Sequence, residues 1–162
     1  YIYAIDVSQD QVVDSIDVGF FNESVVLDNS AHLWVLARGD ESSNNSGQLT
    51  EVDADTRAVL ERKKLDDKPQ NLVYNASNNH LYYINNGINS LPAQTKEIPY
   101  TLYTANGSNF YAIAVDTSNN EVYVSDVHDF TQRSTISRVS ENGELLNEFK
   151  AGIICGNLFF DY

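Results

Sequence analysis

The residues of this chain that are best suited to chemistry lie in short polar segments, which combine aromatic rings with amide side chains. Aromatic rings offer a ligand a large contact area with little loss of conformational entropy, and amides orient it through hydrogen bonds. A large, flat ligand with a polar edge would suit such a set, and so would a glycan or a partner protein. Rings at the loop roots also have a purely structural interpretation, as packing between sheets. The candidate ligand-binding residues are Phe21, Asn22, Arg38, Gln70, Asn71, Asn85, Asn109, Tyr111, His128 and Phe130.

A second cluster, Asp126-Val-His-Asp129, has side chains that ligate metal ions. Imidazole and carboxylate together suit zinc, and the two carboxylates suit calcium at least as well. The same residue types are also ordinary in a solvated surface loop. We therefore assign no metal ligand and no cofactor to this chain.

Nucleophilic catalysis has little support in the sequence. The chain contains no Gly-x-Ser-x-Gly motif, and Cys155 has no histidine at a suggestive spacing. We expect Cys155 to be a buried, inert thiol. His32 and His80 occupy the same turn position in successive repeats, where we expect them to be solvated, and Glu121 takes that position in the third repeat. The chain is therefore expected not to be an enzyme.

A repeated strand pattern must position these residues. It occurs at 24–28, 71–75, 112–116 and 157–161, and the last residues of these segments are 47, 41 and 45 positions apart. A period in the low forties on β-type sequence is typical of propeller blades. Polar turns rich in Asn, Asp and Ser follow the first three copies and lead into a second apolar strand. Trp34, Tyr82 and Tyr123 hold equivalent places in that second strand, which indicates a packing role.

Third and fourth strands complete the repeat. Third strands are expected at 2–6, 49–53 and 136–140, and each is followed by an alternating fourth strand, at 12–18, 59–65 and 145–149. The stretch 85–107 is the weakest copy because it contains Pro92 and Pro99, so we expect irregular strands there.

The fold class predicted by this pattern is all-β, a β-propeller with about three full four-stranded blades and partial blades at both ends. We expect one partial propeller domain over 1–162, which is part of a larger propeller. A strained four-bladed ring is the alternative. In a propeller, the loops that carry the candidate residues would share one face near the axis. The expected blades are 1–19 (outer strands only), 20–66, 67–107, 108–151 and 152–162 (inner strand only).

Composition limits the partners. The formal net charge of the 162 residues is −13, which argues against a nucleic-acid backbone or an anionic membrane as the main partner. No run of 18 apolar residues is present, so no transmembrane segment is expected. The chain contains no methionine, so Tyr1 is not expected to be a translation start, and any targeting segment would lie upstream.

Four stretches carry a resemblance to a known family. They are YIYAIDVSQDQVVDSIDVG (1–19), LWVLARG (33–39), NFYAIAVDTSNNEVYVSDVHDFTQRSTISRVSENGELLNEFKAGI (109–153) and GIICGNLFF (152–160). Together they resemble the C-terminal half of YncE-like, DUF5074-type propeller lipoproteins of gut Bacteroidetes. The family usually has proline where this chain has Cys155, and another in the loop occupied here by Phe20, Phe21 and Asn22.

This resemblance implies a fold and a function. It implies part of a seven-bladed propeller whose last inner strand pairs with the first blade. It also implies a lipid-anchored protein at the cell surface, next to a TonB-dependent outer-membrane transporter. The best understood relatives capture vitamin B12 and other corrinoids. The expected function is therefore non-enzymatic capture of a small-molecule nutrient, with a corrinoid as the leading candidate and the anchor cysteine upstream of Tyr1.

Two other functions stay open from the sequence. One is a propeller that holds a protein or a glycan, which Asp- and Asn-rich loops would favour. The other is a calcium-dependent propeller hydrolase or lactonase, which needs acidic residues from several blades around the axis. The tips of the expected inner strands offer mainly Asn and Gln, with only Glu23 acidic.

Overall fold

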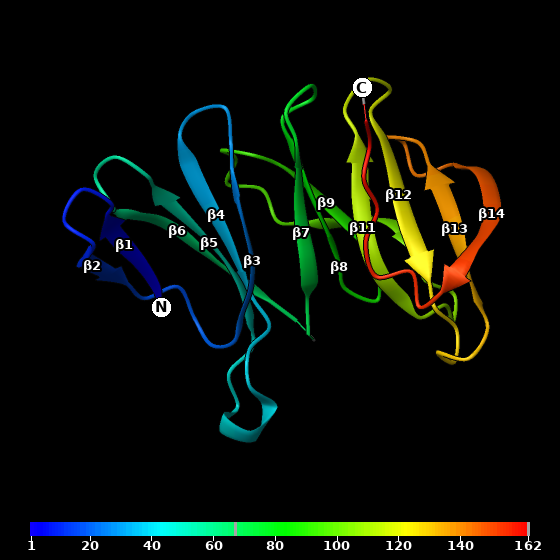
Figure 1. Ribbon diagram of the computed structural model, residues 1–162, viewed down its shortest axis with the longest axis horizontal. Coiled ribbons are helices and arrows are strands. Elements are labelled where there is room, and N and C mark those ends of the chain that lie inside the picture. Colours follow the sequence, from blue (N-terminus) through cyan, green and yellow to red (C-terminus); the bar gives the residue numbers. More distant parts are fainter. Residues whose placement is uncertain (67, 162) are drawn as a thin grey trace. The chain divides into compact units, whose positions relative to one another are not determined.

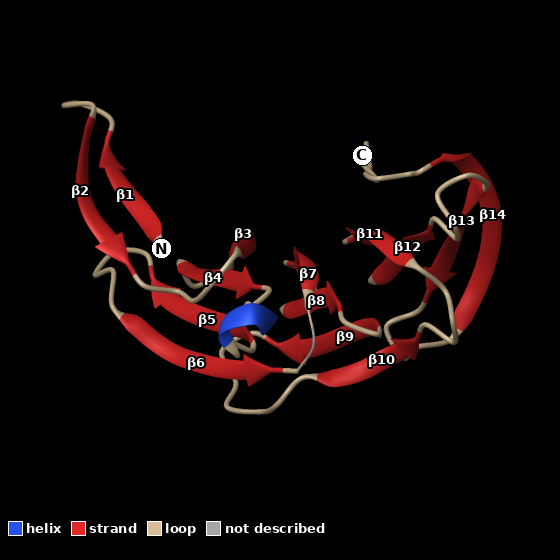
Figure 2. Cartoon of the chain, turned by 90° about the horizontal axis from the view of Figure 1, so that it is seen from below, coloured by secondary structure: helices blue, strands red, loops and turns tan. Residues whose placement is uncertain are grey.

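The computed structural model describes residues 1–66 and 68–161, which are almost entirely β-strands and turns (Figures 1 and 2). The chain divides into two compact units, Tyr1–Gln70 and Asn71–Tyr162. Every strand pairing within the described residues is antiparallel between neighbours in the sequence, as in a meander. No described helix is long and apolar enough to cross a membrane.

The first unit contains a two-stranded sheet and a four-stranded sheet. In the two-stranded sheet, β1 (Ile2–Asp6) pairs with β2 (Gln11–Ile16). A short 3₁₀ helix, Glu41–Ser43, belongs to the loop that joins the second strand of the larger sheet to the third (Figure 2). The larger sheet has the order β3 (Asn22–Leu27), β4 (His32–Ala37), β5 (Gly47–Asp53) and β6 (Val59–Leu65).

The second unit contains two four-stranded sheets. One has the order β10 (Tyr100–Thr104), β9 (Gly87–Pro92), β8 (His80–Ile84) and β7 (Gln70–Asn75), with β7 starting at the last residue of the first unit. The other has the order β11 (Phe110–Asp116), β12 (Glu121–Asp126), β13 (Arg133–Val139) and β14 (Leu145–Ile153). The all-β prediction and the four-stranded repeats are confirmed.

Each unit has an apolar core that sequence alternation creates between its two sheets. In the first unit, Val18, Val35 and Val52 are fully buried, and Ile2 and Ile16 of the two-stranded sheet pack against them. In the second unit, buried side chains of both sheets form one cluster. They are Tyr82, Ile84, Ile88, Phe110, Ile113, Val122, Val124 and Val139.

An Asp or Asn at or directly after the end of each first strand explains why the repeat is recognisable. Asp28, Asn75 and Asp116 are all buried. The Oδ1 atom of each accepts a hydrogen bond from the backbone N–H two residues later, at 2.8, 2.9 and 2.9 Å. This Asx turn satisfies a buried polar side chain and reverses the chain at once. The turn therefore requires Asp or Asn at one position of every repeat.

The prediction of irregular outer strands in the weakest repeat is confirmed for β10 but not for β9. Strand β9 pairs with β8 without interruption, from His80–Pro92 to Ile84–Ile88. Its pairing with β10 shifts register between Thr101 and Tyr103. Pro92 closes β9, where a missing N–H does least harm to the ladder.

The inner strand expected within 152–162, from the repeat pattern at 157–161, is wrong, because residues 157–161 form no strand; residue 162 lies outside the described residues. A strand needs a ladder partner, and this segment is instead held by side-chain contact. The ring of Phe160 meets Tyr123 edge to face, with centroids 5.0 Å apart, while Phe159 is 89% exposed. The division of the chain into blades of a single propeller stays a prediction.

The equivalent aromatic residues have the expected packing role, although unequally. Trp34 and Tyr82 are buried, whereas Tyr123 is half-buried. The expectation that His32 and His80 are solvated is wrong, because both are half-buried. His32 Nδ1 lies 2.7 Å from Glu51 Oε1, and His80 Nδ1 lies 2.8 Å from the Asn78 carbonyl oxygen.

The buried Trp34 gives a test of this packing. Its Nε1–H donates to Asp28 Oδ2 at 3.0 Å, so Trp34→Phe removes a hydrogen bond from a buried carboxylate and leaves a void. We expect the free energy of unfolding to fall by about 2–4 kcal/mol. Tyr123→Phe, at the equivalent half-buried position, should lower it by less than about 1 kcal/mol. Urea denaturation measures both, and equal losses would contradict the assigned packing.

Candidate ligand-binding site

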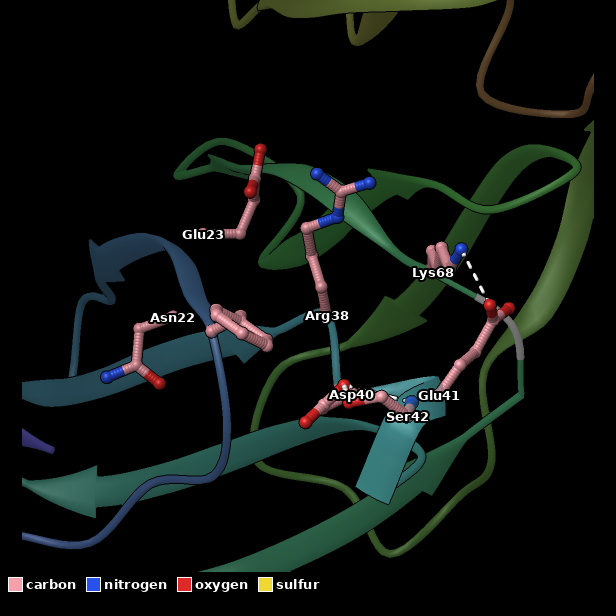
Figure 3. Close-up of a pocket in the computed structure, with 9 residues that line it drawn as sticks. Asn22, Glu23, Arg38, Asp40, Glu41, Ser42 and Lys68 are labelled. Carbon is pink, nitrogen blue, oxygen red and sulfur yellow. Dashed lines mark hydrogen bonds and ion pairs between the residues drawn. The ribbon is translucent and has the colours of Figure 1, made fainter. Parts of the chain in front are cut away.

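A concave surface in the first unit brings three of the predicted residues together. The cavity has a volume of about 520 Å³. It lies where β3 begins and β4 ends, and the loop after β4 forms one wall (Figure 3). It is lined by Phe21, Asn22, Glu23, Arg38, Gly39, Asp40, Glu41, Ser42 and Lys68.

Phe21 presents its ring to solvent from a constrained backbone. Its φ is +52°, a left-handed conformation that a bulky residue rarely adopts, and its side chain is 67% exposed. Two hydrogen bonds hold the segment: Arg38 N–H donates to the Phe21 carbonyl and Gly39 N–H to the Phe20 carbonyl, both at 3.0 Å. The ring is therefore displayed by a fixed backbone rather than by a loose loop.

Asp40 builds the adjoining wall. Its backbone exchanges two hydrogen bonds with Asn45, at 2.7 and 2.8 Å. Its carboxylate accepts from the Ser42 and Ser43 hydroxyls, both at 2.7 Å, and from the Ser42 N–H at 3.0 Å. These bonds, above all the one from the Ser42 hydroxyl, lower the pKa of Asp40 below its usual value. The wall is therefore organised before any ligand arrives.

Both signs of charge meet in the cavity. Lys68 Nζ lies 3.0 Å from Glu41 Oε2, in an ion pair whose side chains are 53% and 77% exposed (Figure 3). Such a pair is weak and can yield to a ligand. Within residues 1–66 and 68–161, Arg38 makes no ion pair, and its guanidinium extends between Glu23 and Lys68 in the view of Figure 3. Its five donors suit a carboxylate, a phosphate or several carbonyl oxygens.

Asn22, the third predicted residue of this cavity, also has a structural role. Asn22 Nδ2 donates to the Tyr1 carbonyl at 2.8 Å, so the amide nitrogen anchors the segment before β1. Gln70, at the start of β7, is half-buried and does not line this cavity.

A second group of predicted residues meets in the second unit. Asn109 Nδ2 donates to the His128 carbonyl at 3.0 Å. The rings of Tyr111 and Phe130 meet edge to face, with centroids 5.6 Å apart. Asn71 Nδ2 donates to the Tyr111 carbonyl at 2.6 Å. The two amides therefore hold backbone instead of being displayed to a ligand.

Asn85 belongs to neither group. It follows β8, and its carbonyl accepts from Asn89 Nδ2 at 2.7 Å. The ten predicted residues thus form two groups, one in each unit, with Gln70 and Asn85 outside both.

The carboxylates around His128 already serve the local turn. Asp126 Oδ1 accepts from the N–H groups of Asn109 and His128, at 3.0 and 2.8 Å. Asp129 accepts from Thr131 and Gln132, whose side-chain bonds, Gln132 first, hold the pKa of Asp129 well below its usual range. The described residues include no group of three or more His, Cys, Asp or Glu side chains arranged for a metal ion.

The prediction of a buried Cys155 thiol is wrong, since the residue is half-buried. Its backbone, not its sulfur, carries the main contacts. Cys155 N–H donates to Ser134 Oγ at 2.9 Å, and Ser125 Oγ donates to the Cys155 carbonyl at 2.7 Å. These two serines fasten the segment that follows β14 to the sheet.

Sequence reasoning missed the wall of the first cavity and one of its two cations. Glu23, Lys68 and the run Gly39–Ser42 were not assigned to the site. A local signal existed, because Asp40 followed two and three residues later by Ser42 and Ser43 is an Asx-turn pattern. Lys68 is 30 residues beyond Arg38, and although the repeat predicts their loops on one face, no sequence pattern singled out the Lys68 side chain.

No protein-family model and no curated protein matches the sequence. Solved structures do match. The hydrazine synthase of Kuenenia stuttgartiensis has a TM-score of 0.71 and 12% identity, over 91% of this chain and 42% of that chain. A chain of a nidogen–laminin complex has a TM-score of 0.64 and 10% identity, over 93% and 59%. A quinoprotein alcohol dehydrogenase-like protein of Bacteroides thetaiotaomicron has a TM-score of 0.60 and 17% identity, over 79% and 33%.

The chain has a β-propeller fold. The similarity to these proteins, combined with the four-stranded antiparallel sheets, carries this conclusion. At such identities the comparison shows the fold alone. This propeller chain spans between a third and three-fifths of the length of the three structures.

Gly39 gives a test of the rigid wall. Its φ is +80°, and a Cβ there would lie 2.4 Å from the Asn45 carbonyl oxygen. Gly39→Ala should therefore destabilise the fold by about 3 kcal/mol, through backbone strain plus overlap. Gly107 has a φ of +90° but open space around a Cβ. Gly107→Ala isolates the strain and should lower stability by only about 1 kcal/mol. Thermal denaturation compares the variants, and equal losses would contradict a packed wall.

The hydrogen bonds of Asp40 predict a pH effect. Because the folded pKa lies below the ordinary value of 3.8, the turn is favoured above that value and loosens as pH falls through the folded pKa. The Ser42 amide resonance should therefore titrate at a pH below 3.8 in an NMR experiment. The same resonance should not titrate in Asp40→Asn. A midpoint at or above the ordinary value would show that the hydroxyl bonds do not form.

Proposed function

We propose that this chain is the ligand-binding module of a cell-surface β-propeller protein that captures a small-molecule nutrient without transforming it. The observation that carries the proposal is the first-unit cavity. This cavity is lined by the exposed ring of Phe21 and by Arg38, whose backbones are joined by a hydrogen bond. The adjoining wall is held by the hydrogen bonds of Asp40. An exposed aromatic ring beside a multiple donor is an arrangement suited to a flat ligand with polar substituents.

A corrinoid such as vitamin B12 is the leading candidate. Its planar macrocycle would stack on Phe21, and its peripheral amide and phosphate oxygens would accept from Arg38 and Lys68. A cavity of about 520 Å³ holds only one edge of so large a molecule. The sequence resemblance to corrinoid-capturing lipoproteins supports the same ligand. It also supports a lipid anchor and hand-over to a TonB-dependent outer-membrane transporter.

A second candidate function is recognition of a protein or a glycan. Phe20 and Phe21 are 56% and 67% exposed, so two adjacent residues present apolar rings to solvent. The fold is also shared with a chain found in a complex between nidogen and laminin. Rings of this kind are frequent anchors of protein interfaces.

Calorimetric titration of the chain with cyanocobalamin tests the leading candidate. We expect measurable heat, and Phe21→Ala should weaken binding by about tenfold or more because it removes the stacking surface. Arg38→Lys keeps the charge but loses the fork of donors, so it should also weaken binding. Phe159→Ala removes a still more exposed ring that does not line the cavity, and should leave the affinity unchanged.

Absence of heat with the unmodified chain would remove the corrinoid. Capture of a membrane protein or a glycan by the same chain, lost in Phe21→Ala, would then favour the second function. Equal weakening by Phe159→Ala would show that the cavity is not the site.

A further inference from the structure

A line of polar side chains crosses three strands of the second unit. Asp126 of β12 is the cross-strand neighbour of Thr135 in β13, and Thr135 is the neighbour of Lys150 in β14. Directly opposed residues point to the same face of a sheet, so these three side chains form a row at one end of it. His128 follows Asp126 by two residues and lies against the row.

Three short contacts connect this row. His128 Nδ1 lies 3.1 Å from Asp126 Oδ2. His128 Nε2 lies 2.9 Å from Thr135 Oγ1. Lys150 Nζ donates to the same Thr135 oxygen at 2.7 Å. The order is carboxylate, imidazole, hydroxyl and ammonium, each within hydrogen-bond reach of the next.

The two ends of the row, the Asp126 carboxylate and the Lys150 ammonium, determine the direction of the hydrogen bonds between them. Burial raises the pKa of Asp126, but the N–H groups of His128 and Asn109 outweigh it, so that its pKa is lowered and the carboxylate only accepts. His128 Nδ1 then carries a proton, and in the neutral tautomer with that proton Nε2 is an acceptor. Lys150 can only donate, so it occupies a lone pair of the Thr135 oxygen. The Thr135 hydroxyl therefore directs its proton to His128 Nε2.

This is the bonding pattern of an activated hydroxyl. A base accepts the proton of the hydroxyl, a carboxylate holds the base in the correct tautomer, and a cation beside the hydroxyl oxygen favours loss of its proton. Access is also present, since the His128 side chain is 28% exposed, Thr135 is half-buried and Lys150 is exposed.

We propose that Thr135 is a nucleophile that takes the acyl group of a small carboxylic ester, with His128 as its general base and Asp126 as a positioning residue. The Thr135 oxygen attacks the carbonyl carbon while its proton passes to His128 Nε2. The ester C–O bond then breaks, and His128 returns that proton to the leaving alcohol. Water cleaves the resulting threonyl ester, which releases the carboxylic acid and restores the hydroxyl.

Exposed aromatic residues also lie at this end of the sheet, where β11 pairs with Asp126. The loop that carries His128 also carries Phe130, which is 44% exposed and meets the ring of Tyr111, itself 39% exposed. This site goes beyond capture in the first-unit cavity and departs from the sequence expectation that the chain is not an enzyme.

A fluorophosphonate probe tests the nucleophile directly. Such a probe reacts with an activated hydroxyl, since a P–O bond forms, the P–F bond breaks, and fluoride and a proton leave. We expect mass spectrometry of peptides to find the label on Thr135. Thr135→Val, which is nearly isosteric, should abolish labelling, and Thr135→Ser should retain it. Thr131→Val, in the same loop but bonded to Asp129 and not to His128, should label like the unmodified chain.

The base and its positioning residue need separate readouts. His128→Gln should slow labelling by about 100-fold or more, as expected for loss of a general base. Asp126→Asn should shift the tautomer of His128, seen in its ¹⁵N imidazole resonances, and Asp126→Glu should restore both tautomer and labelling in part. Each variant is compared at a temperature below its measured melting point, so that loss of fold is not mistaken for loss of base.

Label on lysines alone, no label at Thr135, or equal rates in the unmodified chain and His128→Gln would overturn the proposal. The row would then serve only to tie the ends of three strands together. None of these outcomes depends on binding of cyanocobalamin in the first unit, so the two proposals fail independently.

Discussion

Each four-stranded sheet has an apolar face that must be covered by another sheet. This need for sheet-on-sheet packing determines where the strands, the loops and the candidate residues lie within each unit. Strands β11 to β14 bury Val122, Val124 and Val139 only because the sheet of β7 to β10 supplies Tyr82 and Ile88 opposite them. Val35 and Val52 are buried in the same way against the two-stranded sheet. Because the sheets of each unit pack face to face, the ends of their strands are held in place. The loops that join these strands therefore hold the candidate side chains in defined positions.

Left-handed backbone occurs at four of the candidate residues, as it does at ten other described non-glycine residues. Phe21, Asn71, His128 and Phe130 all have φ between +52° and +64°. This region is uncommon for any residue other than glycine, and persists only where surrounding bonds hold it. The bonds are present: Arg38 N–H holds Phe21, Asp126 holds the His128 N–H, and the Val127 carbonyl accepts from Phe130 N–H. The strain is therefore evidence of organised loops, in both units, at the places where ligand contacts were expected.

The sequence was sufficient for whatever depends on local pattern. The period of the repeat, the Asx turns at Asp28, Asn75 and Asp116, and the burial of Trp34 and Tyr82 follow from residue type and alternation. It was not sufficient where a partner is decided by pairing across strands. Asp126 and Thr135 are neighbours because of the register of β12 and β13, which no spacing in the chain reveals. The strand prediction for residues 157–161 is wrong for the same reason, because an apolar segment forms a strand only where a neighbouring strand pairs with it.

The chain is acidic, yet each of its two sites is organised around a cation. Arg38 and Lys68 line the cavity of the first unit, and Lys150 ends the polar row of the second, in a chain with only 10 Lys and Arg against 23 Asp and Glu. At physiological ionic strength, charges are screened beyond about 8 Å, so the nearest cation has the largest effect on a bound ligand. A ligand with one anionic or strongly polar edge on a neutral body can contact that cation with little repulsion from the acidic chain, whereas a polyanion is repelled more strongly. The charge distribution thus selects the same kind of molecule as the exposed rings do: flat, mostly uncharged, and polar at one edge.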